Sequence, residues 1–271
     1  MAIPKTFLIG ATAPDIGGLR AYLEYTKQIE FLRDFDEAIA GGISPGMALC
    51  SFYAKLCYKS LVMGRNSNLT GIRDIEDNLI GVFKSGHGSV LEHCQLNFVT
   101  TGCSRVFSHE LVRHRVGTAY SQTSGRYCTV EDAELVIPPE LELSPELDEE
   151  GDSTIAEEMR AALFGIKENV ARWRRILKLD DPGTPFSVKK RLTSALRRIM
   201  PNGATNEIGW SMNLRSLRHV IELRTSRHAE WEIRQVFHDV ANIIHDRWPL
   251  MLYGGKRDSV DGLGEWTGLR V

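Results

Sequence analysis

The sequence of 271 residues lacks the features that mark several special classes of protein. It has no run of about 18 apolar residues, so we predict no transmembrane helix. The first 15 residues hold one lysine and a short apolar stretch, which is too little for a signal peptide. Repeats and low-complexity tracts are also absent, which excludes collagen and extended disorder as descriptions of the chain.

Paired cysteine motifs are missing as well. The chain has five cysteines, an odd number, and none of them forms a CxxC pair. This pattern argues against a disulfide framework and against a structural zinc site. We therefore expect a reducing compartment, the cytoplasm.

Net charge is nearly zero, with 33 basic and 35 acidic residues giving −2. Such a balance gives no general attraction to nucleic acid or to a membrane surface. The basic residues are unevenly placed, because residues 186–234 contain ten Lys or Arg against four Asp or Glu. That excess favours an anionic small-molecule site, and a solvated helix face is the alternative.

Hydrophobic periodicity predicts an α+β fold, with helices around a few antiparallel-type strands. Ser44-Pro45 is typical of a helix start, and Thr154-Ile-Ala-Glu157 is a capping box. The predicted helices are 19–39, a helix that opens at Ser44-Pro45, one around 75–83, 104–115, one that opens at Thr154, 187–199 and 211–246. The predicted strands are 94–100 and one or two within 127–136, followed by an acidic loop over 140–152.

One stretch superficially resembles a zinc-hydrolase motif. His109 is followed by Glu110 and, five positions after His109, by His114. Zinc-binding helices of the HExxH type place their histidines four residues apart, on one face. A separation of five turns the second histidine by roughly 140° on a helix. We therefore predict no metal site.

Arginines and hydroxyl groups are concentrated shortly after this stretch. Arg113-His114-Arg115 is followed by Ser121-Gln-Thr-Ser-Gly-Arg-Tyr127. Guanidinium groups bind oxyanions in pairs of hydrogen bonds, and hydroxyls bind polar rings and phosphates. The segment therefore suits a nucleotide, while a cationic last helical turn at the surface is the alternative.

Charged residues also interrupt an apolar stripe near the C-terminus. On a continuous helix, Leu217, Ile221, Arg224, His228 and Trp231 would lie on one face. A buried arginine is costly unless it is paired. Either Arg224 makes a structural ion pair, or a pocket opens on this stripe.

Together these segments resemble the flavin-dependent thymidylate synthases, the ThyX family. Its signature is an Arg-His-Arg triplet, seven further residues and a serine. Here eight residues, 116–123, separate Arg115 from Ser124, and Ser-Gly-Arg-Tyr at 124–127 is intact. Segments 85–93, 108–115 and 223–234 also resemble the family, and the likeness covers about 53–136 and 186–253.

The resemblance implies one α+β domain over 1–271, a small twisted antiparallel sheet flanked by helices with a helical insertion. It has an N-terminal extension over about 1–50, and the acidic and helical insertion covers about 140–185. It implies a homotetramer with FAD at subunit interfaces. The implied reaction methylates C5 of dUMP, with methylenetetrahydrofolate as one-carbon donor and NADPH as reductant. Partners would be the nucleotide and the folate, and neither nucleic acid nor membrane.

Site residues follow from the matching positions. Arg224 matches the arginine that polarises the uracil ring, so it is the predicted catalytic residue. Predicted flavin contacts are Ser89, Glu92, Arg113, His114, Arg115, Gln122, Asn213, Arg215, His219 and His228. Predicted substrate contacts are Glu110, Arg113, Gln122, Thr123, Ser124, Gly125, Arg126, Arg197 and Arg224.

Two alternatives stay open. The extra residue before Ser124 could widen the substrate range to UMP or another pyrimidine nucleotide. Such a bulge is sterically cheapest at Gly117, within 116–119. The second alternative is a flavin- or nucleotide-binding regulatory protein without catalysis, against which the presence of Arg224, Ser124 and Arg126 argues.

Overall fold

The structure is a computed structural model that describes residues 2–126, 132–142, 153–260 and 262–270. The strand predicted within 127–136 and the acidic loop therefore lie partly outside the described residues. Within the described residues, no helix is both long and apolar enough to cross a membrane. The chain divides into two compact units.

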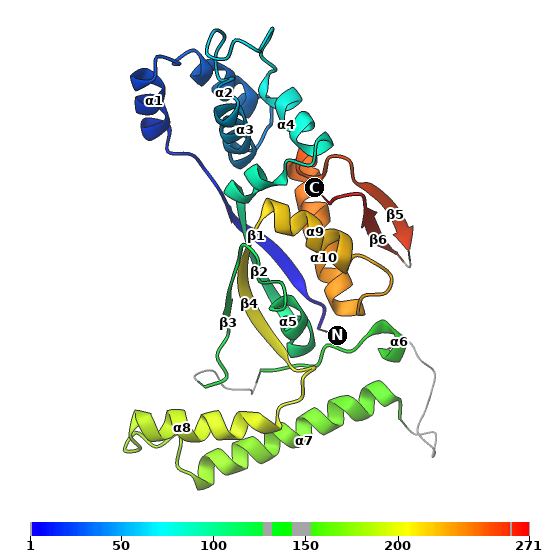
Figure 1. Cartoon of the computed structure of the whole chain (residues 1–271). Helices are drawn as coiled ribbons and strands as arrows, with labels where there is room; N and C mark the ends of the chain where they lie inside the picture. The colour runs from blue at the N-terminus through cyan, green and yellow to red at the C-terminus, as the bar shows by residue number, and fades with distance from the viewer. Residues whose placement is uncertain (1, 127–131, 143–152, 261, 271) are drawn as a thin grey trace. The chain divides into compact units, whose positions relative to one another are not determined.

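A four-stranded sheet contains β1 (Lys5–Ala11), β2 (Gln95–Ser104), β4 (Thr205–Asn213) and β3 (Thr118–Gln122), in that order (Figure 1). With helices around a small antiparallel sheet, the predicted α+β class is confirmed. The order is not that of the sequence, because β4 lies between β2 and β3. Strand β4, which comes from the C-terminal part of the sequence, is therefore paired with a neighbour on both sides.

Hydrogen bonds near the strand ends show how β1 and β2 pair. The Thr12 amide donates to the Gln95 carbonyl at 2.9 Å, while the Thr6 and Thr100 hydroxyls lie 3.0 Å apart. Residue numbers increase along β1 from Thr6 to Thr12, while those of their neighbours on β2 decrease from Thr100 to Gln95. The two strands are therefore antiparallel.

The first unit comprises residues 1–6, 99–113 and 120–209. Its helices are α5 (Arg105–Leu111), α6 (Pro139–Glu142), α7 (Ile155–Ile176), α8 (Phe186–Leu196) and the 3-10 turn η2 (Arg197–Ile199). Leu135 and Ile137 form a small core with Ala156 and Leu163 on one face of α7. The predicted capping box is confirmed, because Thr154 accepts from the Glu157 amide and the Glu157 carboxylate accepts from the Thr154 amide.

The second unit comprises residues 7–98, 114–119 and 210–271. Helices α3 and α4 pack together, and α9 and α10 pack against the terminal hairpin (Figure 1). Its elements are α1 (Ile16–Tyr25), α2 (Phe31–Ala40), α3 (Pro45–Cys57), α4 (Ile75–Lys84), η1 (Gly88–His93), α9 (Leu214–Arg224), α10 (Trp231–Arg247), η3 (Pro249–Leu252), β5 (Lys256–Val260) and β6 (Leu263–Thr267). The start of α3 is as predicted, with Ser44 as N-cap and Pro45 in the first turn.

Two predicted long helices are wrong. The helix predicted over 19–39 is two helices, since residues 26–30 turn and Lys27 has a φ of 57°. Arg65 stabilises this turn by donating to the carbonyls of Thr26 and Lys27. The helix predicted over 211–246 is replaced by the end of β4 and by α9 and α10.

Strand β4 was missed although its sequence alternates. Ile208, Trp210 and Met212 are buried at every second position, the period of a strand. The strands β1, β3, β5 and β6 were also not predicted. By contrast, the predicted strand 94–100 lies in β2, where Leu96 and Phe98 are buried.

Helix α5 is shorter than predicted. It ends at Leu111 and not at residue 115, because Val112 caps it and the chain then turns. Phe107 and Leu111 form its buried stripe as expected, but His114 lies beyond the helix.

Arg218 is the largest of the side chains that are almost completely buried in the described residues. Its guanidinium donates to three backbone carbonyls near the C-terminus: Leu269 at 2.9 Å, Met251 at 2.6 Å and Tyr253 at 2.9 Å. Burial lowers the pKa of Arg218 to about 10, and the carboxylate of Glu222 opposes this effect. The group therefore stays charged at neutral pH and ties the C-terminal segment to α9.

We predict that Arg218→Met lowers the free energy of unfolding by about 3 kcal/mol or more, because three buried carbonyls lose their donor. Arg227→Met is the control, since the Arg227 side chain is exposed and forms an ion pair with Glu265. It should change stability by less than about 1 kcal/mol. Urea unfolding measures both, and equal losses in the two variants would contradict the structural role of Arg218.

Candidate functional site

The predicted site residues fall into both compact units. The first-unit group consists of Glu110, Arg113, Gln122, Thr123, Ser124, Gly125, Arg126 and Arg197. The second-unit group consists of Ser89, Glu92, His114, Arg115, Asn213, Arg215, His219, Arg224 and His228. Most predicted substrate contacts are in the first group, and most predicted flavin contacts are in the second.

A cavity of about 890 Å³ brings together Thr123, Gly125 and Arg197 of the first-unit group. A Cβ atom on Gly125 would lie 3.6 Å from Arg197 Cδ and 3.7 Å from Arg105 Nη2. Two arginines therefore flank the backbone of the loop, as an oxyanion site requires. Arg105, the first residue of α5, was missed by the sequence analysis.

Gln122 is held by its neighbours in the first unit. Its amide nitrogen donates to Ser108 Oγ at 3.0 Å and to Asn206 Oδ1 at 2.7 Å. Asn206 in turn donates to the Cys103 carbonyl at 3.0 Å. This network fixes the orientation of the Gln122 amide at the end of β3, where the loop 123–126 begins.

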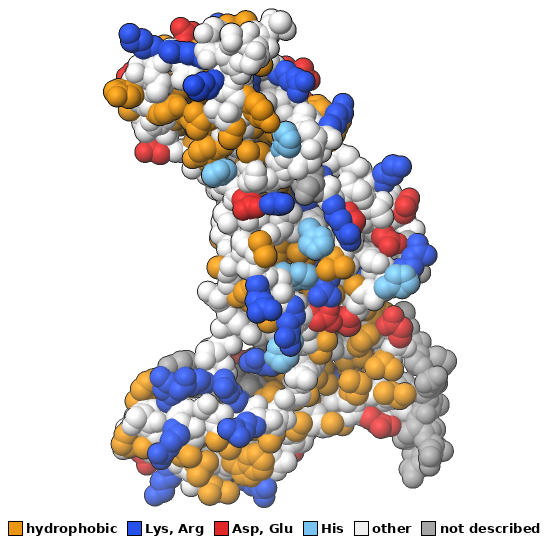
Figure 2. Space-filling model, viewed as in Figure 1, with side chains coloured by type: hydrophobic (Ala, Val, Ile, Leu, Met, Phe, Trp, Pro, Cys, Tyr) orange, Lys and Arg blue, Asp and Glu red, His pale blue; other side chains and the backbone are white. Residues whose placement is uncertain are grey.

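The other end of this loop approaches a second basic depression. The Arg126 amide donates to Ser124 Oγ at 3.4 Å, which turns the backbone. Arg126 also lines a cavity of about 490 Å³ with Lys190, Arg191 and Arg198. Lys and Arg side chains gather over α8 on the face shown in Figure 2. Three of the basic residues counted in 186–234 therefore lie together in this cavity.

In the second-unit group, Glu92 and Arg215 form an ion pair, with Arg215 Nη1 2.6 Å from Glu92 Oε1. Each side chain is a little less than half exposed, so water weakens this attraction. Arg215 and Ser89 both line a cavity of about 1010 Å³. A volume of this size is sufficient for a nucleotide-sized ligand.

Asn213 joins β4 to α9 and is almost fully buried. Its side-chain oxygen accepts from the backbone amide of Ser216 at 2.9 Å, and its backbone amide donates to the Gly117 carbonyl at 2.9 Å. Gly117 has a φ of 63°, and a Cβ atom there would lie 1.9 Å from Asn213 Nδ2. Asn213 therefore connects two segments: the turn at Gly117, which follows the Arg113–Arg115 triplet, and helix α9, which carries Arg215 and Arg224.

Arg224 lies at the C-terminal end of α9, where its Nε donates to His114 Nε2 at 2.9 Å. His114 must be neutral at Nε2 to accept this bond. Burial, and then the charges of Arg224 and His219, lower the pKa of His114 to about 4. The histidine thus orients the guanidinium without neutralising its charge.

One predicted arrangement is wrong. His228 was expected on the same helical face as Arg224, but α9 ends at Arg224 and α10 begins at Trp231. His228 lies in the connecting turn and is exposed. Arg113, Arg115 and His219 are exposed as well, and Glu110 is half-buried.

Comparison with known proteins identifies a family that this chain resembles. Residues 44–250 match the family described as "Thymidylate synthase complementing protein". A flavin-dependent thymidylate synthase from Mycolicibacterium gilvum is 38% identical over 201 residues, 70% of this chain and 72% of the relative. Those from Mycobacterium avium and Thermococcus kodakarensis are 34% and 32% identical, covering 82% of this chain and 84% and 77% of the relatives.

The chain belongs to the flavin-dependent thymidylate synthase family.

In this member of the flavin-dependent thymidylate synthase family, the predicted site residues lie together in small groups. Thr123, Gly125 and Arg197 share one cavity, and Ser89 and Arg215 share another. His114 pairs with Arg224, and Glu92 pairs with Arg215. The sequence contained no signal for these pairs, because their members are about 110 and 123 residues apart.

We predict that Gly117→Ala destabilises the protein by about 3 kcal/mol. The left-handed backbone costs about 1–2 kcal/mol for alanine, and the contact with Asn213 adds overpacking. Gly64→Ala is the matched control, because Gly64 has a φ of 82° and open space around its Cβ position. Thermal unfolding should show a clearly smaller loss for that control, and equal losses would exclude a special role for the Asn213 contact.

We also predict a pH effect from His114. Its pKa is lower in the folded chain than the ordinary 6.5, so the unfolded chain binds more protons between these values. The stabilising contribution is complete above about pH 6.5 and is lost as the pH falls toward about 4. His114→Gln keeps an acceptor for Arg224 but cannot be protonated.

Unfolding free energies measured from pH 7 to 4 should therefore fall more steeply for the wild type than for His114→Gln. Histidine NMR signals followed over the same range provide a direct reading of the protonation of His114. Parallel stability curves for the two proteins would show that the neutral histidine is not required by the fold.

Proposed function

We propose that this protein methylates C5 of dUMP to give dTMP, with methylenetetrahydrofolate as one-carbon donor, FAD as cofactor and NADPH as reductant. Membership of the flavin-dependent thymidylate synthase family supports the reaction class. The observation that carries the proposal is the pairing of Arg224 with a neutral His114, because it presents a positioned positive charge.

Arg224 would act on the uracil ring. C5 becomes nucleophilic only when the ring gains negative charge, and a guanidinium at the ring edge stabilises that charge. Its charge also favours loss of the N3 proton. An arginine stays protonated at any working pH, so it does not itself carry the proton away. His114 would act as a positioning residue by holding Nε.

The nucleotide phosphate would bind at the loop 123–126 of the first unit. Two arginines, Arg105 and Arg197, lie close to Gly125, and Ser124 and Arg126 complete a set of hydroxyl and guanidinium donors. Phosphate favours such charge-assisted bonds. Gln122, held by its two side-chain acceptors, would face the base or ribose.

The second-unit group has a donor set that fits FAD. Ser89 and Arg215 line the cavity of about 1010 Å³. Glu92 pairs with Arg215, and Asn213 caps the helix that carries Arg215. Bound FAD, reduced by NADPH, would supply the hydride for the transferred carbon. Arg113, Arg115, His219 and His228 are exposed, so they are able to contact a cofactor shared between chains.

We propose a homotetramer in the cytoplasm. Large apolar side chains on and beside α7 and α8 are exposed in the single chain, with exposed fractions of 62% for Phe164, 69% for Ile176 and 67% for Phe186. Apolar side chains also reach the surface over these helices in Figure 2. Burial against another copy would remove this surface from water.

UMP as substrate is the alternative that the extra residue favours. Gly117 has a φ of 63°, a left-handed backbone that glycine adopts without steric cost, so a bulge within 116–119 would be sterically cheap there. A comparable kcat/KM for UMP and dUMP would support the wider range. A protein that binds flavin or nucleotide without turnover would instead support a regulatory function.

We predict that Arg224→Ala lowers turnover by about 10²–10³-fold, the usual effect of losing one key electrostatic donor. Flavin content should be nearly unchanged, because the lost contact is to the uracil ring. Arg227→Ala is the matched control, since this exposed arginine pairs with Glu265. Single-turnover oxidation of reduced flavin with dUMP, together with flavin stoichiometry, measures both effects.

A wild-type rate for Arg224→Ala at saturating dUMP would make this arginine structural and overturn the proposed site. His228→Ala should weaken flavin binding and slow turnover less. Absorbance in the flavin bands and a sizing column establish cofactor binding and assembly in the same preparations.

A further inference from the structure

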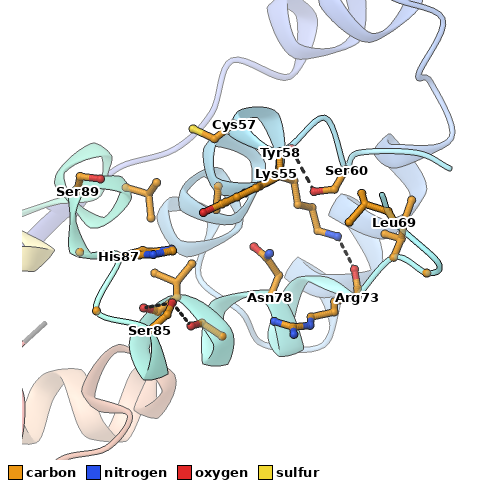
Figure 3. Close-up of a pocket in the computed structure, with 18 of the residues that line it drawn as sticks. Lys55, Cys57, Tyr58, Ser60, Leu69, Arg73, Asn78, Ser85, His87 and Ser89 are labelled. Atoms are coloured by element: carbon orange, nitrogen blue, oxygen red, sulfur yellow. Dashed lines mark hydrogen bonds between the residues drawn. The ribbon is translucent and has the colours of Figure 1, made fainter. Parts of the chain in front are cut away.

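The cavity of about 1010 Å³ in the second unit extends well beyond the predicted flavin contacts. Ser89 and Arg215 form part of its wall, while the remaining wall comes from α3, α4 and the segment 58–73. Figure 3 shows His87 and Ser89 on one side, and Lys55, Arg73 and Asn78 on the other. The second side contains none of the residues assigned to flavin or substrate.

The charged side chains of the wall are all basic. They are Lys55, Arg73 and Arg215, of which Arg215 is paired with Glu92 outside the lining. Among the residues that line this cavity, none is Asp or Glu. The chain as a whole carries a net charge of −2, so the positive wall is a local arrangement. A positive concave surface attracts an anion more strongly than a flat surface does.

Lys55 is the most unusual member because it is almost completely buried. Its ammonium group donates to the carbonyl of Arg73 (Figure 3). Burial lowers the pKa of Lys55, while Asp34 and Asp74 act in the opposite direction. Neither carboxylate lines the cavity. On the side of Lys55 that faces the cavity, a bound anion would therefore supply the negative charge that stabilises its ammonium group.

The position of Arg73 depends on a glycine in α4. A Cβ atom on Gly81 would lie 2.5 Å from Arg73 Nη1. Glycine inside a helix costs about 1 kcal/mol relative to alanine, so its presence needs a compensating role. Here it lets the guanidinium lie against the backbone of α4, near Asn78 in Figure 3, while the Arg73 carbonyl meets Lys55.

We propose that Lys55, Arg73 and Asn78 form an oxyanion site, which binds a phosphate or carboxylate group of a ligand that extends toward His87 and Ser89. The planar guanidinium suits either oxyanion, and the ammonium and amide add further donors. The proposal rests on the proposed function only for the identity of that ligand. The pyrophosphate of the flavin dinucleotide and the carboxylates of the folate both have the required chemistry.

The first experiment uses no cofactor. Inorganic pyrophosphate and triglutamate are titrated calorimetrically into the full chain freed of flavin. We expect Arg73→Gln and Gly81→Ala to weaken binding of at least one probe about tenfold, the loss of one charge-assisted hydrogen bond. Arg73→Gln retains the backbone carbonyl that Lys55 uses, and Gly81→Ala only displaces the guanidinium.

Arg65→Gln is the matched control. Arg65 lies in the same segment, but its guanidinium bonds to the carbonyls of Thr26 and Lys27 and it does not line the cavity. It should bind both probes as the wild type does. Unchanged affinity in both test variants, or no binding of either probe by the wild type, would overturn the site.

A second titration identifies the source of the anion. If FAD loses affinity in Arg73→Gln and riboflavin does not, the site binds the flavin pyrophosphate. If triglutamyl folate loses affinity on the FAD-loaded protein and monoglutamyl folate does not, the site binds the folate tail. Both titrations measure binding and not turnover. A negative result for Arg224→Ala would therefore not affect the conclusion about the oxyanion site.

Discussion

Asn213 determines how the end of β4 is connected to the chemically important residues of the second unit. Its backbone amide bonds to Gly117, and its side chain caps α9 through Ser216. The next residue, Leu214, donates to the Cys94 carbonyl at 2.8 Å. One junction therefore sets the turn that follows the Arg-His-Arg triplet and the first turn of the helix that ends at Arg224. Since the contact leaves no space for a Cβ at position 117, the geometry tolerates little change.

The arginines of the second unit are positioned by partners of different kinds. Arg218 is buried, its guanidinium donates to three backbone carbonyls and it lies over the ring of Phe83, so it serves the fold. Arg215 pairs with a carboxylate, which reduces its effective charge. Arg224 bonds through Nε to a neutral imidazole, which fixes the direction of the guanidinium. A donor held in a fixed direction is suited to stabilising an anion that develops during a reaction.

Much of the helical structure was predictable because its signals are local. Ser44-Pro45, Thr154 with Glu157, and the apolar spacing of 75–83 act within one or two helical turns, and each helix begins as predicted. The strand β2 was predictable from alternation over seven residues. Long helices were predicted less well, since the break at 26–30 is stabilised by Arg65, about 38 residues away. The alternation of Ile208, Trp210 and Met212 is a local signal for the strand β4, but its partners β2 and β3 lie far away in the sequence, so its place in the sheet has no local signal.

The sequence by itself determined the family, the α+β class and the residue types of the site, because motifs and periodicity are properties of neighbouring residues. Only the tertiary structure decided which of these residues meet. It placed His228 in a turn and not beneath Arg224, and it joined Arg224 to His114. It also brought Lys55 and Arg73 to the wall of one cavity, with Gly81 leaving the necessary space. Distances between residues far apart in the chain depend on how strands pair and helices pack, and no local pattern encodes them.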